Sequence, residues 1–292
     1  MNVILYKNES GIDRRIQRTN AIGRHLHRKN LPVRYPIANR IIALHSPTAT
    51  QYAAIYNYLP GDTIPWEAYT KHHIKLLGKA MGNMHHELRD FQKQLPPITD
   101  EYLEITQRMK RYFSDENATR AVREKLLLSI DASFFDRAEK LLERCKTLPY
   151  QQALHMDFVR GNILFRFALP EDALTFKDVA ISGILDFEKA AYGSPIFDVA
   201  RTLSFLLVDC KYKDPEKVTK YFLQSGYNKR SGAAVISLES PLLHQLIKLF
   251  LVYDFYKFLR HNPYESLALN EHFWRTKDIL LERGVIRYSK QE

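Results

Sequence analysis

A short polar loop between two apolar runs constrains this chain more than any other feature of its sequence. Residues 153–165 read ALHMDFVRGNILF, which places His155, Asp157 and Asn162 close together with apolar residues on both sides. The run NILFRFAL continues from Asn162, and a second run, VAISGILDF, delivers Asp186. Runs of this kind predict two antiparallel strands, joined here by the polar stretch PEDALTFKD. Antiparallel pairing brings the start of the first strand to the end of the second, so we expect Asn162 and Asp186 to lie side by side.

The spacing H-x-D-x-x-x-x-N is that of the loop that carries out phosphoryl transfer in kinases. This reaction needs a carboxylate that orients the acceptor hydroxyl and takes its proton, and Asp157 suits that role. It also needs oxygen ligands for the Mg²⁺ that accompanies nucleotide phosphates, which predicts Asn162 and Asp186 as metal ligands. An isolated Asp-x-x-x-x-Asn would mean little, but His155 ahead of it and the strand ending in Asp186 argue against coincidence. We expect His155 to support the loop by hydrogen bonding.

Strand-like runs give way to helical periodicity near residue 60. NVILY, RIIALHS and QYAAIYNYL read as strands, and residues 10–30 read as a basic helix. PGDTIP then indicates a turn and linker, after which apolar residues recur at steps of three and four. We therefore expect an α+β fold with a reduced N-terminal lobe over residues 1–59 and a mostly helical C-terminal lobe over residues 60–292, which holds the loop and the metal site.

The central motifs resemble a known superfamily. LHMDFVRGNILF and ISGILDFEKAAYGSPIFDVARTL are similar to the aminoglycoside phosphotransferase and choline kinase-like superfamily, whose members typically read H-G-D-x-x-x-x-N and then I-D-[FW]-[ED]. YNYLPGD resembles the hinge between the two lobes of that superfamily, LGKAMGNMHHEL its helix ending in L-x-x-L-H, and FDVARTL its D-L-A run. The resemblance implies a bilobal protein-kinase-like fold, with a small sheet-containing lobe and a large helical lobe. It also implies transfer of phosphate from ATP or GTP, with Mg²⁺, to a small molecule.

The resemblance also implies roles for residues of the small lobe. The main chain of Asn57, Tyr58 and Leu59 falls where the hinge binds a purine. Lys7, at the end of VILYK, corresponds to the strand lysine that contacts nucleotide phosphates, and the alternative is an exposed lysine at a strand end.

In the large lobe, the resemblance makes Asp157 the catalytic base, and Asn162 and Asp186 the magnesium ligands. Asp198, in FDVARTL, is expected to support the catalytic loop. Glu188 follows Asp186 closely and is predicted either to approach the metal or a cationic group of the substrate, or to be a solvated acid.

Three departures from the superfamily pattern concern the loop and the small lobe. Met156 stands where glycine is usual. No glycine-rich hairpin precedes Lys7, and Thr19 and Asn20 stand where the following helix should offer a glutamate. These departures fit a minimal kinase, a chain that lacks its true N-terminus, or a nucleotide-binding pseudokinase.

Charge limits the class of substrate and partner. The segment 98–148, where the superfamily builds its substrate walls, is nearly charge-balanced, which disfavours a polycationic aminoglycoside and favours a homoserine-, choline- or sugar-type acceptor. The net charge is +10, and residues 1–40 supply +7 of it. This bias leaves a nucleic-acid-associated protein as an alternative, although no nucleic-acid-binding motif is present.

Cysteine content and hydropathy bear on the compartment. With two cysteines there is no disulfide framework, which favours a reducing cytoplasm. The longest apolar stretch, LIKLFLVYDFYKFL, is interrupted by charges and predicts no membrane span. The oligomeric state stays open.

Overall fold

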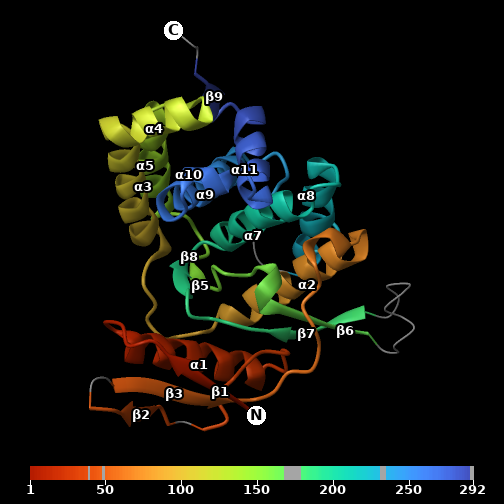
Figure 1. Cartoon of the computed structure of the whole chain (residues 1–292). Coiled ribbons are helices and arrows are strands. Elements are labelled where there is room, and N and C mark those ends of the chain that lie inside the picture. Colours follow the sequence, from red (N-terminus) through yellow and green to blue (C-terminus); the bar gives the residue numbers. More distant parts are fainter. Residues whose placement is uncertain (39, 48–49, 168–178, 231–234, 290–292) are drawn as a thin grey trace.

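Strands gather at the N-terminal end of the molecule, and helices fill most of the rest (Figure 1). The computed structural model describes residues 1–38, 40–47, 50–167, 179–230 and 235–289, so the predicted connection PEDALTFKD lies outside the described residues. The strands are β1 (Asn2–Tyr6), β2 (Ile42–His45), β3 (Thr50–Tyr56), β4 (Leu128–Ile130), β5 (Gln152–Leu154), β6 (Ile163–Phe167), β7 (Val179–Ile184), β8 (Ala191–Gly193) and β9 (Ile286–Tyr288). The α-helices are α1 (Ile12–Arg28), α2 (Lys71–Leu88), α3 (Ile98–Ser114), α4 (Glu116–Leu126), α5 (Ser133–Cys145), α7 (Ile196–Asp209), α8 (Pro215–Leu223), α9 (Pro241–His261), α10 (Tyr264–Leu267) and α11 (Glu271–Glu282). Short 3₁₀ turns are η1 (Trp66–Ala68), η2 (Arg160–Asn162) and η3 (Tyr227–Lys229).

The N-terminal sheet is antiparallel, with strand order β1-β3-β2. Because the side chains of a strand alternate between its two faces, Ile4 and Tyr6 turn toward α1, whereas Val3 and Leu5 are exposed. Tyr6 packs with Ile12 and Ile16 of α1 in a small core of its own. The strands and the helix predicted for this region are confirmed.

Helix α1 connects this small core to the main core of the molecule. Its first half packs on the sheet, but Ile22 and Leu26 near its end belong to the large hydrophobic cluster of the helical part. The connector after α1 then pairs directly with β7: Arg34 donates its main-chain N–H to Ile184 O at 2.9 Å, and Ile184 donates to Pro32 O at 2.8 Å. The N-terminal part is therefore fixed against the strand that leads to Asp186.

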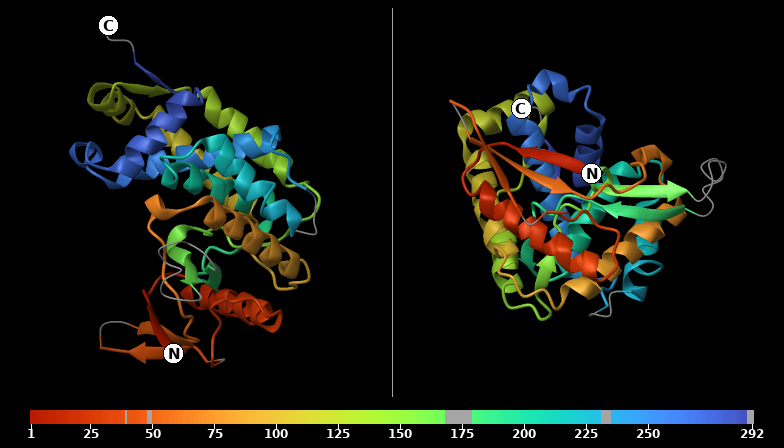
Figure 2. Two further views of the ribbon diagram at one scale, coloured as in Figure 1. Left: turned by 90° about the vertical axis from the view of Figure 1, so that its right-hand side faces the viewer. Right: turned by 90° about the horizontal axis from the view of Figure 1, so that it is seen from below.

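The predicted antiparallel pair is formed by β6 and β7, with Ile163 opposite Ile184. The two strands lie between the N-terminal sheet and the helices (Figures 1 and 2). A register shift after Leu164 leaves Phe165 to exchange main-chain hydrogen bonds with Asp62 at 2.9 and 3.0 Å. The segment around Asp62, which leads from β3 to α2, is therefore paired with β6.

Close helix packing completes the large part. A Cβ atom added at Gly78 of α2 would lie 2.2 Å from the main-chain oxygen of Phe222 in α8, so only glycine permits this approach. Cys145 and Cys210 are buried free thiols. Within the described residues, no helix combines the length and apolar character needed to cross a membrane.

Candidate active site

The polar loop predicted from the sequence lies between β5 and β6. β5 pairs with β8, and the loop then runs through η2, which ends at Asn162. The Asn162 side chain donates Nδ2–H bonds to the main-chain oxygen of Asp157 at 2.9 Å and to Asp157 Oδ2 at 3.2 Å. Leu185 donates its N–H to the main-chain oxygen of Asn162 at 2.8 Å. Asp186 is the next residue in the chain, so this bond brings it close to Asn162. The structure thus brings Asp157, Asn162 and Asp186 to one place.

Asp198, in the first turn of α7, forms hydrogen bonds to the start of the loop. Its buried carboxylate accepts the main-chain N–H of His155 at 2.7 Å and that of Met156 at 2.6 Å. It also bonds His85 Nε2 at 2.9 Å, and His85 Nδ1 bonds the Tyr227 hydroxyl at 2.9 Å. Burial by itself raises the pKa of Asp198, but the His85 hydrogen bond and the neighbouring histidines outweigh it, so its pKa lies below the ordinary value. A charged, fully bonded carboxylate therefore fixes the start of the loop.

His155 is enclosed within the site. Burial lowers its pKa, so the ring is neutral near pH 7. Its Nδ1 accepts the Asp157 N–H at 3.2 Å, which leaves Nε2 protonated to donate to the Leu185 main-chain oxygen at 3.0 Å. The imidazole therefore connects Asp157 with Leu185, the residue before Asp186, and this contact fits the expected supporting role.

Two residues of the site have left-handed backbone conformations. Met156 has φ of 60° and Asp186 has φ of 57°. Such angles are uncommon for residues other than glycine, and aspartate tolerates them better than methionine does. Met156 stands where the resembling sequences carry glycine, so the backbone angle gives a physical reason for that preference. Strained residues of this kind concentrate at functional sites, where the surrounding bonds hold them in place.

The oxygen atoms of Asn162 and Asp186 form a donor set suited to Mg²⁺. Both side-chain hydrogen bonds of Asn162 use its Nδ2, which leaves Oδ1 without a hydrogen bond among the described residues. Asp186 Oδ1 accepts the Glu188 N–H at 3.2 Å, and burial together with the Asp186 charge raises the pKa of Glu188. Within the described part of the chain, no group of three His, Cys, Asp or Glu side chains is arranged to bind a metal.

Lys189 is a site residue that the sequence did not identify. Its Nζ lies 2.9 Å from Asp157 Oδ1, and its side chain is 63% exposed while that of Asp157 is 12% exposed. A largely exposed cation therefore pairs with a mostly buried carboxylate. Its position three residues after Asp186 is the only sequence signal that could have pointed to it.

The predicted hinge residues follow β3. The side chain of Asn57 binds the connector after α1: its Oδ1 accepts the Tyr35 N–H at 2.8 Å, and its Nδ2 donates to the Val33 main-chain oxygen at 3.3 Å. Tyr58 is exposed, whereas Leu59 lies close to Gly183 of β7, where an added Cβ would be 3.1 Å from Leu59 Cδ1. This segment therefore spans from the N-terminal sheet to the β6–β7 pair.

Lys7 lies apart from the other predicted residues. It is exposed, one residue beyond β1, and it makes no hydrogen bond or ion pair with the described residues. At the end of β1, the neighbouring Tyr6 turns toward α1, and its hydroxyl lies 2.6 Å from that of Tyr56. Tyr56 in turn donates to Asn20 Oδ1 of α1 at 2.8 Å. A neutral hydrogen-bonded chain thus occupies the space between the strand and the helix.

Two arginines approach the site from the N-terminal part. Arg15 of α1 lies 3.6 Å from Glu188 Oε2, and the positive charges of Arg15 and Arg34 both act on Glu188. The Arg34 guanidinium lies over the Tyr56 ring, 5.1 Å from its centroid. These cations were visible in the sequence only as part of a basic segment.

Comparisons with known proteins identify relatives of this fold. A family model described as the phosphotransferase enzyme family (APH) matches residues 4–212, well over half of the chain. The structure is similar to that of amicoumacin kinase hAmiN in complex with AMP-PNP, Ca²⁺ and Ami, with a TM-score of 0.68 and 13% identity over 99% of this chain and 83% of that one. It is also similar to the microcompartment-associated aminopropanol kinase, with a TM-score of 0.61 and 14% identity over 98% and 87% of the two chains. Spectinomycin phosphotransferase, APH(9)-Ia, in complex with ADP and spectinomycin gives a TM-score of 0.52 and 16% identity over 94% and 80%. No curated protein sequence matches the chain. These similarities confirm the predicted α+β, bilobal protein-kinase-like fold.

Proposed function

This chain belongs to the phosphotransferase enzyme family, and we propose that it moves the γ-phosphate of ATP or GTP to a hydroxyl group of a small molecule. The observation that carries the proposal is the bonded unit of Asp157 and Asn162, to which the Leu185 hydrogen bond adds Asp186. A carboxylate for the acceptor and oxygen ligands for a metal are the two groups that phosphoryl transfer requires.

Asp157 acts on the acceptor in this proposal. Its carboxylate orients the hydroxyl and takes its proton as the oxygen attacks phosphorus. Lys189 occupies one carboxylate oxygen at 2.9 Å, and its exposed side chain can swing aside as the acceptor enters. We propose that its ammonium group then moves toward the transferring phosphoryl group, where negative charge is concentrated.

Asn162 and Asp186 would hold Mg²⁺ together with the nucleotide phosphates. Bound there, the metal would neutralise phosphate charge. The left-handed backbone of Asp186 and the Leu185–Asn162 hydrogen bond fix the two ligands relative to each other before any nucleotide arrives. Glu188 lies beside them with a raised pKa, and Arg15 partly neutralises its charge.

The nucleotide would lie between the proposed lobes, residues 1–59 and 60–292. We propose that the main chain of Asn57, Tyr58 and Leu59 binds the purine, with Leu59 and β7 forming its floor. Lys7 stays a predicted phosphate contact. Arg34 has stronger support, because its main-chain N–H is bonded to Ile184 and its charge acts on the Asp186–Glu188 region.

Amino alcohols are the acceptors that the described charges favour. Glu101, in the first turn of α3, lies within electrostatic range of Lys189 and forms no ion pair among the described residues. An ammonium group placed beside Glu101 would bring a hydroxyl of the same small molecule toward Asp157. Homoserine- and choline-type acceptors carry such a cation, and a structural neighbour of this chain is an aminopropanol kinase. A sugar acceptor would not use this carboxylate.

The test is Mg²⁺-dependent ATP and GTP turnover by the full chain against a panel of amino alcohols and sugars. Asp157→Asn is the matched variant: we expect turnover to fall by about 10²–10⁴-fold, because a general base acts in the transition state, with nucleotide affinity nearly unchanged. Equal activity of the variant and the parent would refute the role of Asp157. Nucleotide binding without turnover on any acceptor would favour a pseudokinase, for which the neutral Tyr6–Tyr56–Asn20 chain is the supporting observation.

A further inference from the structure

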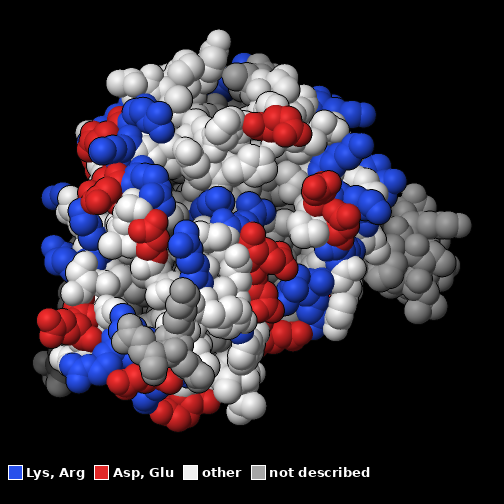
Figure 3. All heavy atoms as spheres, turned by 90° about the horizontal axis from the view of Figure 1, so that it is seen from above, with Lys and Arg blue, Asp and Glu red and all other residues white. Residues whose placement is uncertain are grey.

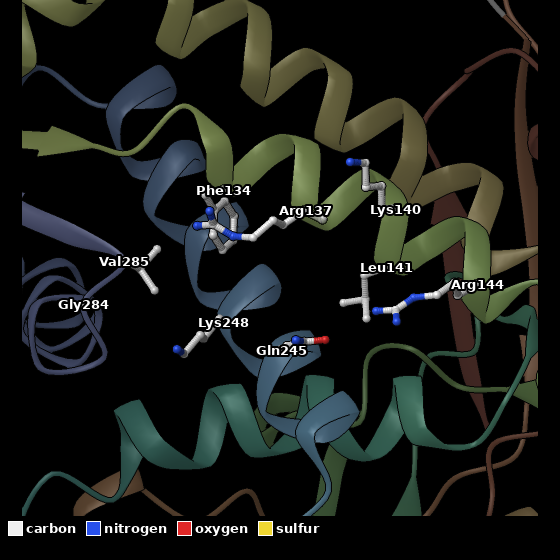
Figure 4. A pocket seen from close by; sticks show the side chains of 10 residues that line it. Phe134, Arg137, Lys140, Leu141, Arg144, Gln245, Lys248, Gly284 and Val285 are labelled. Atoms are coloured by element: carbon white, nitrogen blue, oxygen red, sulfur yellow. The ribbon is translucent and has the colours of Figure 1, made fainter.

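A cavity of about 500 Å³ lies between α5 and α9, beside the turn that precedes β9. Figure 4 shows it from close by, with side chains of α5 and α9 facing each other across the opening. Its apolar lining comes from Phe134, Ala138 and Leu141 of α5 and from Val285. Ala138 and Leu141 are buried, so the floor of the cavity is continuous with the main hydrophobic core. The volume is in the range of sites that hold small organic molecules.

The charged lining of this cavity has a single sign. The basic residues that line it are Arg137, Lys140, Arg144 and Lys248, and none of the described acidic residues lines it. Arg137 is partly neutralised, since it lies 3.3 Å from Asp131 Oδ2. Arg144 and Lys248 have no side-chain hydrogen bond or ion pair among the described residues. Figure 3 looks down on this end of the molecule and shows Lys and Arg side chains near a hollow in the middle of the face.

This charge is unusual for its surroundings. The segment 98–148, which includes α5, is nearly balanced in acids and bases. On other sides of α5 its charges are paired: Asp136 lies 2.6 Å from Lys110 of α3, and Lys146 lies 3.3 Å from Asp100. Among the described residues, Arg144 and Lys248 on the cavity side have no carboxylate partner, although Arg137 has one. A ligand with negative charge would supply what the protein does not.

The cavity is separate from the candidate active site. None of its lining residues belongs to the catalytic loop, the predicted metal ligands or the hinge. The face of α5 that carries Asp136 and Glu139 packs toward α3, whereas the stripe of Phe134, Ala138 and Leu141 faces α9. Occupation of the cavity therefore does not require the nucleotide or the acceptor.

We propose that this cavity binds a small organic anion with an apolar body, such as an aromatic or aliphatic carboxylate, sulfonate or phosphate ester. The apolar floor would bury the body, and Arg144 and Lys248 would contact the acidic group at the opening. A half-open cavity of about 500 Å³ with cations at its opening fits a small molecule better than an acidic helix of a partner protein, which needs an extended groove.

The experiment uses a pair of probes that differ in charge. 8-Anilinonaphthalene-1-sulfonate is an apolar anion, and N-phenyl-1-naphthylamine has the same ring systems without the sulfonate. Titration calorimetry with the full chain should show roughly tenfold tighter binding of the anion, as expected for a charge-assisted contact. The double variant Arg144→Gln/Lys248→Gln should bind the anion at least about fivefold more weakly and the neutral probe almost as well as the parent.

Two further variants decide between the cavity and the general surface. Lys217→Gln/Lys220→Gln removes the same charge from the exposed face of α8 and should change the affinity for the anion by less than about twofold. Gln245→Trp should fill the opening and weaken both probes. Circular dichroism spectra and unfolding midpoints like those of the parent would establish that each variant is folded.

Several results would overturn the proposal. Equal losses in the two double variants would mean that the anion responds only to net charge. Equal affinity of the parent for the two probes would mean that the cations do not contribute. Unchanged binding in Gln245→Trp would place the probe elsewhere. If the chain bound a Glu-rich amphipathic peptide but neither probe, the cavity would instead be part of a protein-docking surface.

Discussion

Replacing Asp198 by asparagine should destabilise the chain and loosen the candidate catalytic loop, although the two side chains have nearly the same shape. The buried carboxylate accepts the N–H groups of His155 and Met156 and bonds the His85 ring. An asparagine amide has one acceptor oxygen, and its NH₂ group would face a donor on the other side. At least one buried donor would then lack an acceptor.

The magnitude follows from these contacts. An unsatisfied buried donor costs about 1–3 kcal/mol, and bonds to a neutral acceptor are roughly half as strong as bonds to a charged one. Loss of the charge also removes the cost of burying it, so the total should stay near the lower end of the roughly 3–5 kcal/mol lost when a buried pair is broken. We therefore expect the free energy of unfolding to fall by about 3 kcal/mol near pH 7.

The pH dependence of this loss is an independent check. The pKa of Asp198 in the folded chain lies below its ordinary value, because the His85 bond outweighs the opposing effect of burial. A lowered pKa gives stability that is fully present above the unfolded-state value of about 3.9 and is lost as the pH falls through the folded-state value. The difference between parent and variant should be constant from about pH 7 to about pH 5 and should shrink below about pH 4.

Urea unfolding followed by far-UV circular dichroism measures the difference, and hydrogen exchange of the 153–158 segment reports on the loop itself. Asp90→Asn is the matched control, since Asp90 is an exposed carboxylate 2.8 Å from Lys29 and its loss should cost less than about 1 kcal/mol. A loss for Asp198→Asn no larger than for the control would refute the reasoning. So would a difference between parent and variant that is the same at about pH 3 as at about pH 7.

Three further changes test other parts of the structure. Asp186→Asn should weaken Mg²⁺–nucleotide binding and turnover together, because a metal ligand loses its charge. Calorimetry with and without Mg²⁺ should distinguish it from Asp157→Asn, which keeps nucleotide affinity. Glu101→Gln should raise the KM for an amino alcohol about five- to tenfold and leave that for an uncharged polyol unchanged in steady-state kinetics. Gly78→Ala should lower the free energy of unfolding by about 1–3 kcal/mol in urea titrations, since the contact of its Cβ with Phe222 outweighs a gain in helix propensity of about 1 kcal/mol.

The sequence predicted the features that depend on local pattern. Apolar runs of strand character around a polar stretch predicted the β6–β7 pair, and the pairing of Ile163 with Ile184 confirms it. Because Asn162 precedes Ile163 and Asp186 follows Ile184 closely, that pairing alone brings the two residues near each other. The roles of these residues in catalysis stay predictions, because contacts show where side chains lie and not what they do.

Contacts between distant segments could not be predicted in the same way. Lys189 reaches Asp157 because the chain turns back after β7, and no periodicity encodes that turn. Arg15 meets Glu188 only when α1 is fixed against the helical part. The side chains of a strand alternate between its two faces, so an error of one residue assigns a side chain to the wrong face. In β1 it is Tyr6, rather than the following Lys7, that turns toward α1.

The cations of the N-terminal part are organised by the connector after α1 rather than by the sheet. Tyr6, Tyr56 and Asn20 form a neutral chain, so β1 and α1 contribute no ion pair between them in the described structure. Arg34 instead lies on a segment whose main chain is bonded to Ile184, two residues before Asp186. Its main chain is therefore positioned by hydrogen bonds to β7, while its guanidinium lies over the Tyr56 ring of β3. A phosphate held by Arg34 and by a metal on Asp186 would lie between two segments that main-chain hydrogen bonds join, and this arrangement would align a nucleotide without a lysine on the strand.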